Sequence, residues 1–177
     1  NTLKNIKKKI KLSSMITSLK STVKEGMNLK INIIMGLPDE THLDIWKTLL
    51  FIVRMSLAGA HDISVGVFAP YPGSPLYDRL VKEGKISHSE EYWSKLAYVD
   101  ISDTLSYSNH VSSKTLRIYN WLGFAFFYGS NYMFRPWRAV ATVAHIITGN
   151  HKSRGEMALA TLSKRLLEFL HLKKAKP

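Results

Sequence analysis

The sequence contains no cysteine in its 177 residues. Disulfide bonds, thiolate nucleophiles and cysteine-ligated zinc or iron–sulfur sites are therefore excluded within this chain. Its seven histidines lack the spacing of metal ligands, and no serine stands in the context of a nucleophile elbow. We therefore assign no catalytic residue and no metal ligand to the chain. A cysteine-free sequence is compatible with a cytoplasmic protein, which is the location we expect.

Long apolar runs and targeting signals are missing as well. The longest apolar run of the C-terminal part, Trp121–Tyr128, is far shorter than the roughly 20 residues of a membrane span. The basic start of the sequence is not followed by the apolar segment of a signal peptide. Leu3, Ile6 and Ile10 already follow helical spacing. The sequence thus opens within an amphipathic helix, and we expect it to be a piece of a longer protein.

Acidic residues are scarce, since 13 of them stand against 25 lysines and arginines and give a net charge of +12. Such a balance suggests an anionic partner. The lysines concentrate at the two ends, however, so a solvated basic surface is the simpler interpretation and nucleic acid is not favoured. The aromatic region Trp121–Trp137 includes Arg135 and leaves peripheral membrane contact through residues 113–148 open. The alternative function is thus a non-catalytic basic module that binds an anionic membrane surface or RNA.

The apolar pattern predicts an α/β protein. The composition, 45% apolar and 11% aromatic, is that of a globular chain. Two short apolar segments, 29–35 and 62–69, alternate with helical patterns, as expected for parallel strands with crossover helices. The helices are expected at 13–25 with Ser13 and Ser14 as the N-cap, from Thr41 to Gly59, and at 76–82 after Pro75, with Gly26 and Gly84 ending the first and the last.

The first strand and its helix carry the clearest local signals. Residues 29–35 are apolar on both faces apart from Asn32, which predicts a strand covered on both sides. Thr41, with Asp44 three residues on, is a variant capping box that opens a long helix. Its apolar stripe is expected at Ile45, Leu49, Val53 and Leu57.

The second strand has two unlike faces. Ile63, Val65 and Val67 share one face and are all β-branched, so this face is expected to pack on helices. The mixed face, with Ser64, Gly66 and Phe68, is expected to look towards a barrel interior or a ligand.

Beyond Gly84 the pattern changes. Residues 86–111 are polar and rich in serine, typical of a connector, with one short helix near Tyr92–Ala97. From residue 112 onward we expect a helical extension. Its three helices are predicted at 113–130, 136–148 and 154–172.

Each strand runs into a turn rich in glycine and proline that leads to a helix. The roughly thirty residues between the two turns suit a parallel crossover, so both turns are expected at one end of the sheet, where α/β proteins bind ligands. Asp39, Glu40 and Asp44 crowd the first helix N-terminus with negative charge, which opposes a bound phosphate. No Walker or dinucleotide fingerprint is present. A cofactor without phosphate, such as an adenosyl sulfonium, fits this turn better.

These turns resemble motifs of radical S-adenosylmethionine (radical SAM) enzymes. Gly36-Leu-Pro-Asp-Glu-Thr41 is similar to the Gly-hydrophobic-Pro-Gly-Glu-Thr signature of the family, with Asp39 in place of glycine. Phe68-Ala-Pro-Tyr-Pro-Gly-Ser-Pro-Leu-Tyr77 is similar to the following strand and its Pro-Gly-Thr-Pro-Leu-Tyr turn, with Ser74 in place of threonine. The resemblance covers residues 1–85. The helical tail resembles that of the cobalamin-binding branch better than the small β-barrel of the tRNA methylthiotransferases.

The resemblance implies the C-terminal portion of a partial (β/α) TIM-like barrel, residues 1–85, followed by a connector, 86–111, and an α-helical extension, 112–177. In this family a reduced [4Fe–4S] cluster cleaves SAM to methionine and a 5′-deoxyadenosyl radical, which abstracts hydrogen from the substrate. The cluster-binding Cys-x-x-x-Cys-x-x-Cys loop would lie upstream of Asn1, in the missing N-terminal barrel portion. The parent protein would thus be an enzyme acting on an unknown small molecule, with cobalamin as a further cofactor in that branch, and the isolated chain would be inactive.

By the same resemblance, this chain supplies the wall that faces the adenosine of SAM. Tyr71, Tyr77 and Phe68 are the aromatic residues available to stack on adenine, with core packing as the alternative for Phe68. The residues expected to bind the cofactor are Asn32, Ile34, Gly36 and Glu40 from the first strand and turn, and Phe68, Pro70 and Gly73 from the second.

Overall fold

The computed structural model describes residues 11–87, 89–95, 105–150, 155–157, 159–161 and 163–165. The chain forms two compact units, Asn1–Tyr128 and Gly129–Pro177. The protein is of the α/β class and mostly helical, with one small parallel sheet in the first unit. The α/β class, with parallel strands joined by a crossover helix, agrees with the sequence prediction.

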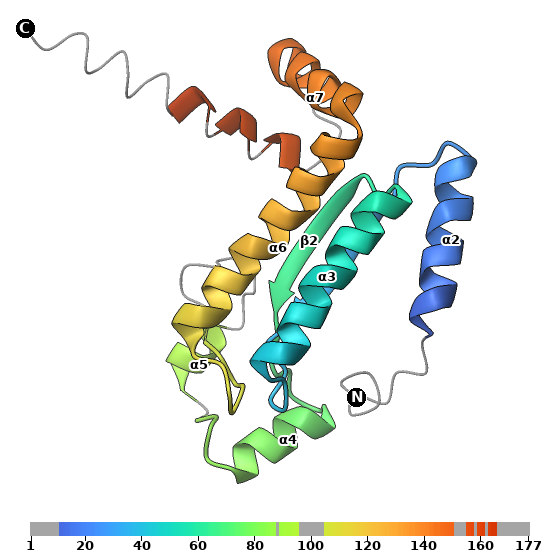
Figure 1. Cartoon of the computed structure of the whole chain (residues 1–177). Coiled ribbons are helices and arrows are strands. Elements are labelled where there is room, and N and C mark those ends of the chain that lie inside the picture. The colour runs from blue at the N-terminus through green and yellow to red at the C-terminus, as the bar shows by residue number, and fades with distance from the viewer. Residues whose placement is uncertain are drawn as a thin grey trace, which may run out of the picture. The chain divides into compact units, whose positions relative to one another are not determined.

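The sheet consists of strands β1, Lys30–Met35, and β2, Asp62–Val67. They pair in parallel with Lys30 opposite Asp62 and Met35 opposite Val67, so both strands end at the same level. The crossover between them is helix α3, His42–Ala58, which lies lengthwise along the strands (Figure 1). The predicted parallel pair with a crossover helix is confirmed.

One face of the sheet carries the main core of the first unit. Helices α2, Leu12–Lys24, α3 and α6, Ser113–Phe134, contribute side chains to it. The β-branched face of β2 lies in this core, as predicted. Burial of these apolar side chains is the principal stabilising term, at about 1.5–3 kcal/mol for each fully buried one. The core residues include Leu19, Ile31, Met35, Ile45, Leu49, Ile52, Ile63, Val65, Val67, Leu116 and Phe127.

Beyond Asp62, which is buried, the opposite face of the sheet is largely uncovered by the part of the chain that the structure describes. Asn32 is exposed, Ile34 is 58% exposed, and Ser64 and Gly66 are half-buried. The prediction that the first strand is covered on both sides is therefore wrong for the described chain. Ile34 is as apolar as its buried neighbours, so the sequence pattern could not distinguish the open face. We call this surface, formed by Asn32, Ile34, Ser64 and Gly66, the bare face.

The two edges of the sheet differ. The amides of Asp62 and Phe68 donate to carbonyls of the first strand segment, so the backbone groups of the alternate residues of β2 point outward. Helix α6 binds these outward-pointing groups. Asn120 Nδ2 donates to the Val65 carbonyl over 2.9 Å. The Tyr128 hydroxyl donates to the Asp62 carboxylate, which also accepts a hydrogen bond from the Ile63 amide. The edge of β1 has no strand partner among the described residues. The sheet is closed on the β2 side and open on the β1 side.

Most predicted helix ends are confirmed. The Thr41–Asp44 capping box is complete, Gly59 ends α3 in a left-handed conformation with φ 116°, and Ser74 caps α4, Pro75–Lys82. The serine cap of the first helix is wrong. Lys11 is the N-cap of α2 and makes no side-chain cap hydrogen bond, while the serines lie within the helix.

The predicted stripe of α3 is correct only in its first half. Ile45 and Leu49 are buried, but burial then moves to Ile52, Met55 and Ser56, and Leu57 is exposed. Steps of four residues advance by more than one turn of a 3.6-residue helix, so a strict four-residue stripe drifts off the core.

The later helices are α5, Glu90–Lys95, α6 and α7, Pro136–Thr148. The boundaries of α7 agree with the prediction, and α5 overlaps its predicted position. Helix α6 runs to Phe134 rather than ending near residue 130, because the Gly129-Ser-Asn segment stays helical. Of the predicted last helix, residues 155–157, 159–161 and 163–165 are helical, and its other positions lie outside the described residues. No helix in the described chain is long and apolar enough to cross a membrane.

Candidate functional site

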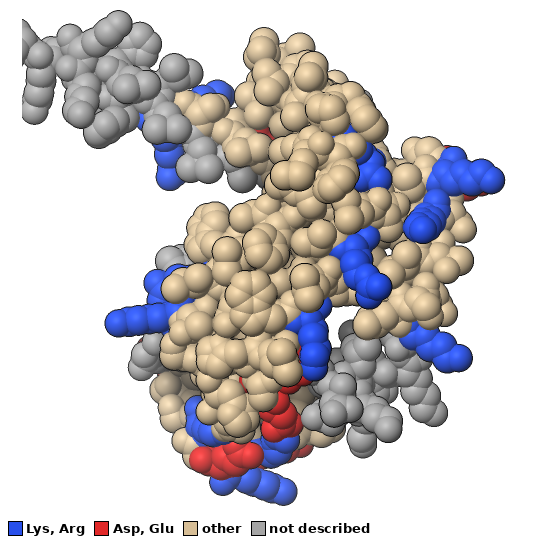
Figure 2. All heavy atoms as spheres, in the orientation of Figure 1, with Lys and Arg blue, Asp and Glu red and all other residues tan. Residues whose placement is uncertain are grey.

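The two glycine- and proline-containing turns lie side by side at the carboxyl end of the sheet. The Phe68 amide donates to the Met35 carbonyl over 2.8 Å, which extends the strand pairing into the turns. Arg79 of α4 then reaches across to the first turn and binds both carboxylate oxygens of Asp39, at 3.1 and 3.2 Å. The predicted juxtaposition of the two turns is confirmed. Ion pairs and hydrogen-bonding groups gather at this end, where acidic and basic side chains lie together around α4 (Figure 2).

The first turn depends on Gly36. Its φ is +87°, a backbone conformation that favours glycine, and a Cβ built there would lie 2.5 Å from Leu116 Cδ2 of α6. A side chain at this position would therefore require Leu116 of α6 to move. The neighbour that the Gly36 backbone approaches in the structure is thus α6.

Glu40 closes the same turn from within. Its Oε2 accepts hydrogen bonds from the amides of Gly36, at 2.7 Å, and Leu37, at 3.0 Å. The residue is buried. Burial raises the pKa of the Glu40 carboxyl above 4.5, while the two amides act in the opposite direction and the charge of Asp44 adds to the increase. In this structure Glu40 holds the turn in shape.

The second turn is fixed mainly through Pro70. Its carbonyl accepts a 2.5 Å hydrogen bond from the Tyr92 hydroxyl of α5, and burial raises the pKa of Tyr92 to about 12, with smaller contributions from neighbouring tyrosines. Tyr77 is buried beside Tyr92 in a small second core. Tyr71 and Gly73 are exposed, and Gly73 has φ +82°. Of the aromatic residues proposed for stacking, Tyr71 is thus the accessible one.

A third segment, residues 105–111, completes this end of the sheet and was not singled out in the sequence. Ser108 Oγ donates to the Glu40 carbonyl over 3.0 Å, and the Asn109 amide donates to the Pro38 carbonyl over 3.0 Å. Tyr107 meets Phe68 edge-on, with ring centroids 6.5 Å apart. Predicted only as a connector, the segment ties both turns together. Its run of serines and asparagine was the one available signal, since such residues hydrogen-bond backbone in turns.

The seven proposed cofactor-binding residues fall into two groups. Asn32 and Ile34 lie on the bare face, with Phe68 half-buried just beyond β2 and Gly73 exposed in the second turn. Gly36, Glu40 and Pro70 are buried within the turns, so that they shape the surface rather than present side chains on it. Together with the neighbouring Ser64 and Tyr71, the accessible residues offer one side-chain amide, two hydroxyls and apolar area. Such a surface suits a neutral, flat ligand better than a phosphate.

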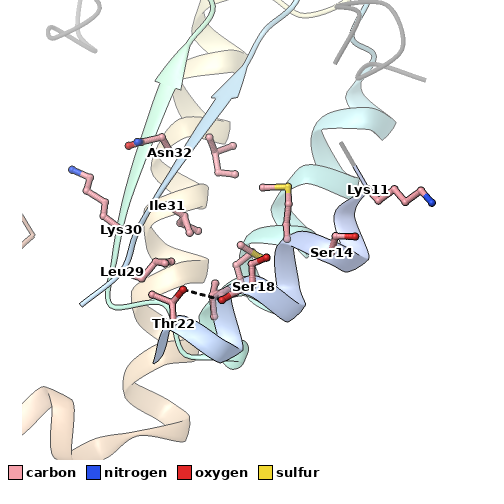
Figure 3. A pocket seen from close by; sticks show the side chains of 12 residues that line it. Lys11, Ser14, Ser18, Thr22, Leu29, Lys30, Ile31 and Asn32 are labelled. Atoms are coloured by element: carbon pink, nitrogen blue, oxygen red, sulfur yellow. Dashed lines mark hydrogen bonds between the residues drawn. The ribbon is translucent and has the colours of Figure 1, made fainter. Parts of the chain in front are cut away.

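A groove lies elsewhere, between α2 and the open edge of β1. Ser14, Ser18 and Thr22 line it from α2, and Leu29–Ile33 line it from the strand (Figure 3). Lys30 and Asn32 point to the side of the strand away from α2 (Figure 3). The groove therefore follows the unpaired edge of β1 and is separate from the two turns.

Metal binding by the described residues has no support from their arrangement. No group of three histidine or acidic side chains in that part of the chain is placed to hold a metal ion. His42 instead contacts the Tyr119 hydroxyl, at 3.0 Å. The sequence contains no cysteine that could ligate an iron–sulfur cluster.

Comparisons with known proteins do not assign the chain to a family. No family model matches it, and neither the curated proteins nor the solved structures contain a match.

We expect the substitution Glu40→Gln to change the pH dependence of stability. Because the folded-state pKa of Glu40 is raised, its contribution to stability is fully present below the unfolded value, 4.5, and is lost as the pH rises through the folded-state value. The glutamine side chain keeps an oxygen that can accept hydrogen bonds from both backbone amides, and the side chain does not ionise. The stability of Glu40→Gln should therefore increase relative to that of the original chain as the pH rises from below 4.5, as measured by urea unfolding at a series of pH values. Parallel stability curves would contradict the assignment.

Proposed function

We propose that this chain is the C-terminal part of a radical SAM enzyme and supplies the wall that contacts the adenosine of SAM. The architecture supports the proposal in three ways. The two strands are parallel and joined by a crossover helix, helices α2, α3 and α6 pack on one face of the strands, and the residues of the bare face are exposed or half-buried. A strand pair with helices outside and an open inner face is the repeating element of a (β/α) barrel.

The observation that carries the proposal is the continuity between the bare face and the two turns. Ile34 leads directly into Gly36, and Gly66 leads into Phe68, so the open surface ends at the turns that resemble the SAM motifs. Ser64 and Gly66 are small and leave space above the sheet. The Asn32 amide group can donate to and accept from a purine edge, and Ile34 offers an apolar surface to a ring.

The edges of the sheet are consistent with a position at the end of a barrel. Helix α6 closes the outer edge of β2, which suits the last strand of a partial barrel. The open edge of β1, beside the groove under α2, is where a preceding strand would pair, because a strand before α2 in a right-handed crossover would lie next to β1.

The residues present do not fit an iron–sulfur cluster, since the chain contains no cysteine. No chemical step is therefore assigned to this chain. Its role is confined to binding and orienting the adenosyl group, and cobalamin binding would involve other parts of the parent protein. After reconstitution with iron and sulfide, the isolated chain should form no 5′-deoxyadenosine above a control without protein; detectable product would contradict this division of roles.

The decisive experiment uses the longer protein that carries both this segment and a Cys-x-x-x-Cys-x-x-Cys loop. We expect it to cleave SAM, and we expect Gly66→Val to raise the KM for SAM at least about tenfold by filling the space above the bare face. A Cβ at Gly66 would lie no closer than 3.8 Å to another atom and its φ is not positive, so the fold should tolerate the change. Ala125→Val, which introduces the same side chain on the exposed side of α6, is the control. Unchanged kinetics in Gly66→Val would exclude the bare face from the SAM site.

A further inference from the structure

Helix α7 turns its polar side chains towards the rest of its own unit. Arg138 donates to Asn131 Oδ1 over 3.2 Å, and the hydroxyls of Tyr132 and Thr142 are 3.3 Å apart. His145 Nδ1 lies 2.9 Å from Glu156 Oε1. The inner side of α7 therefore contacts the other described residues of the second unit through hydrogen bonds.

The outer side of α7 is apolar. Trp137, Val140, Val143 and Ile147 are between 55 and 79% exposed, and their spacing places them along one side of the helix. None of the charged residues of α7 lies among them. The surface over α7 shows few charged side chains in Figure 2. We call these four residues the α7 apolar face.

Other described residues of the second unit show the same exchange of exposed apolar and buried polar side chains. Met133, Phe134, Met157 and Leu159 are also exposed large apolar residues, whereas Asn131, Thr142 and Glu156 are buried. In water, apolar side chains are usually buried and polar ones exposed. Exposed apolar side chains along one side of a helix, as on the α7 apolar face, indicate a surface that is covered in use.

Charge and length together indicate what covers it. Residues 129–177 contain nine lysines and arginines and two acidic residues, a net charge of +7 with histidine neutral. A basic segment with an apolar helix face and a tryptophan is typical of contact with an anionic lipid surface. At about 1.5 Å per residue, the 13 residues of α7 extend roughly 20 Å, which is too short to cross a hydrocarbon core of about 30 Å. The helix is suited to lie in the interface.

We propose that the α7 apolar face inserts into the surface of an anionic membrane, with α7 parallel to the bilayer plane. Trp137 then lies at the headgroup boundary, and Val140, Val143 and Ile147 contact acyl chains. The polar side chains of α7 keep their hydrogen bonds to Asn131, Tyr132 and Glu156. This inference stands independently of the proposed SAM site.

The test is flotation of the full chain with phosphatidylcholine vesicles that contain or lack phosphatidylglycerol. We expect binding to the anionic vesicles, weaker at high salt, and weaker binding to the neutral ones. Val140→Asp should reduce the partition coefficient at least about tenfold, and Trp137→Ala about tenfold, because each loses roughly the transfer free energy of one buried apolar side chain. Since these positions are exposed, both variants should retain the circular dichroism spectrum of the original chain.

Leu50→Asp is the matched control, because Leu50 is 60% exposed but lies on α3 in the first unit. It should bind vesicles within about twofold of the original chain, since no membrane-facing apolar area is lost. Brominated lipids should quench a part of the tryptophan fluorescence that is absent in Trp137→Phe. Three results would overturn the proposal: no flotation of the original chain, equal loss in Leu50→Asp and Val140→Asp, or self-association or RNA binding in its place. In the self-association case, Val140→Asp would abolish a dimer in the absence of lipid.

Discussion

Replacing Gly36 with valine is expected to destabilise the first unit by about 3 kcal/mol or more, from two sources that add. The φ of +87° is strained for any residue with a Cβ, and most for a β-branched one. The new Cβ would also lie 2.5 Å from Leu116 Cδ2, in a part of the core where Leu116 is fully buried and has little room to move. A loss of this size is a large part of the stability of a typical domain.

The matched control is Gly73→Val in the second turn. Gly73 has nearly the same φ, +82°, but nothing lies within 4 Å of its Cβ position. This variant should lose only the backbone term, about 1–2 kcal/mol. Urea unfolding of both variants measures the difference, which represents the contact with α6. Adding Leu116→Ala to Gly36→Val should show positive coupling, because it removes the atoms that clash. Equal losses in the two glycine variants would show that α6 does not pack against the first turn.

Asn120→Asp is expected to have a comparably large effect at neutral pH, about 3–5 kcal/mol. Asn120 is fully buried, and its Nδ2 donates to the Val65 carbonyl at the outer edge of β2. Its Oδ1 has no hydrogen-bond partner within the described chain. An aspartate would place a buried negative charge against a carbonyl oxygen, with no donor or cation to compensate for it.

The comparison variant is Asn120→Leu, which has similar size and no charge. It should lose only the bond to Val65 and leave that carbonyl unsatisfied, at a cost of about 1–3 kcal/mol. Acidification should recover stability in Asn120→Asp alone, because a protonated carboxyl can donate to the Val65 carbonyl. Urea unfolding of both variants at neutral and acidic pH provides the measurement. If both variants are equally stable at neutral pH, Asn120 does not close the edge of the sheet.

Local signals in the sequence predicted the parts of the fold that depend on near neighbours. The capping box at Thr41, the left-handed end at Gly59 and the helix start at Pro75 are each set by a few adjacent residues. The β-branched face of β2 was identifiable because alternation along a strand directly reports which residues share a side.

What the sequence did not reveal depends on contacts between distant residues. Ser108 lies 68 residues from Glu40, and Asn120 lies 55 residues from Val65. Neither polar residue carries a periodic signal, so their partners could not be inferred. The open position of Ile34 was missed for the same reason, because a pattern shows which residues are apolar but not whether a second layer is present to cover them.

For the candidate site, the sequence predicted that the two turns meet but not how each residue is used. Gly36 and Glu40 belong to one short turn, and their proximity followed from the motif. Glu40 points inward because its carboxylate accepts hydrogen bonds from the backbone amides of Gly36 and Leu37. The positions of these amides are set by the unusual backbone conformation of Gly36.

The unequal edges of the sheet have a consequence for biosynthesis. A ribosome releases β1 and β2 before α6, so for a time both strands offer unpaired backbone to neighbouring nascent chains. Once α6 emerges, Asn120 and Tyr128 end lateral addition on the β2 side, and any further strand can join only beside β1. A product terminated before Ser113 would lack Asn120 and Tyr128, and such translation products should enter inclusion bodies more readily than the chain of 177 residues.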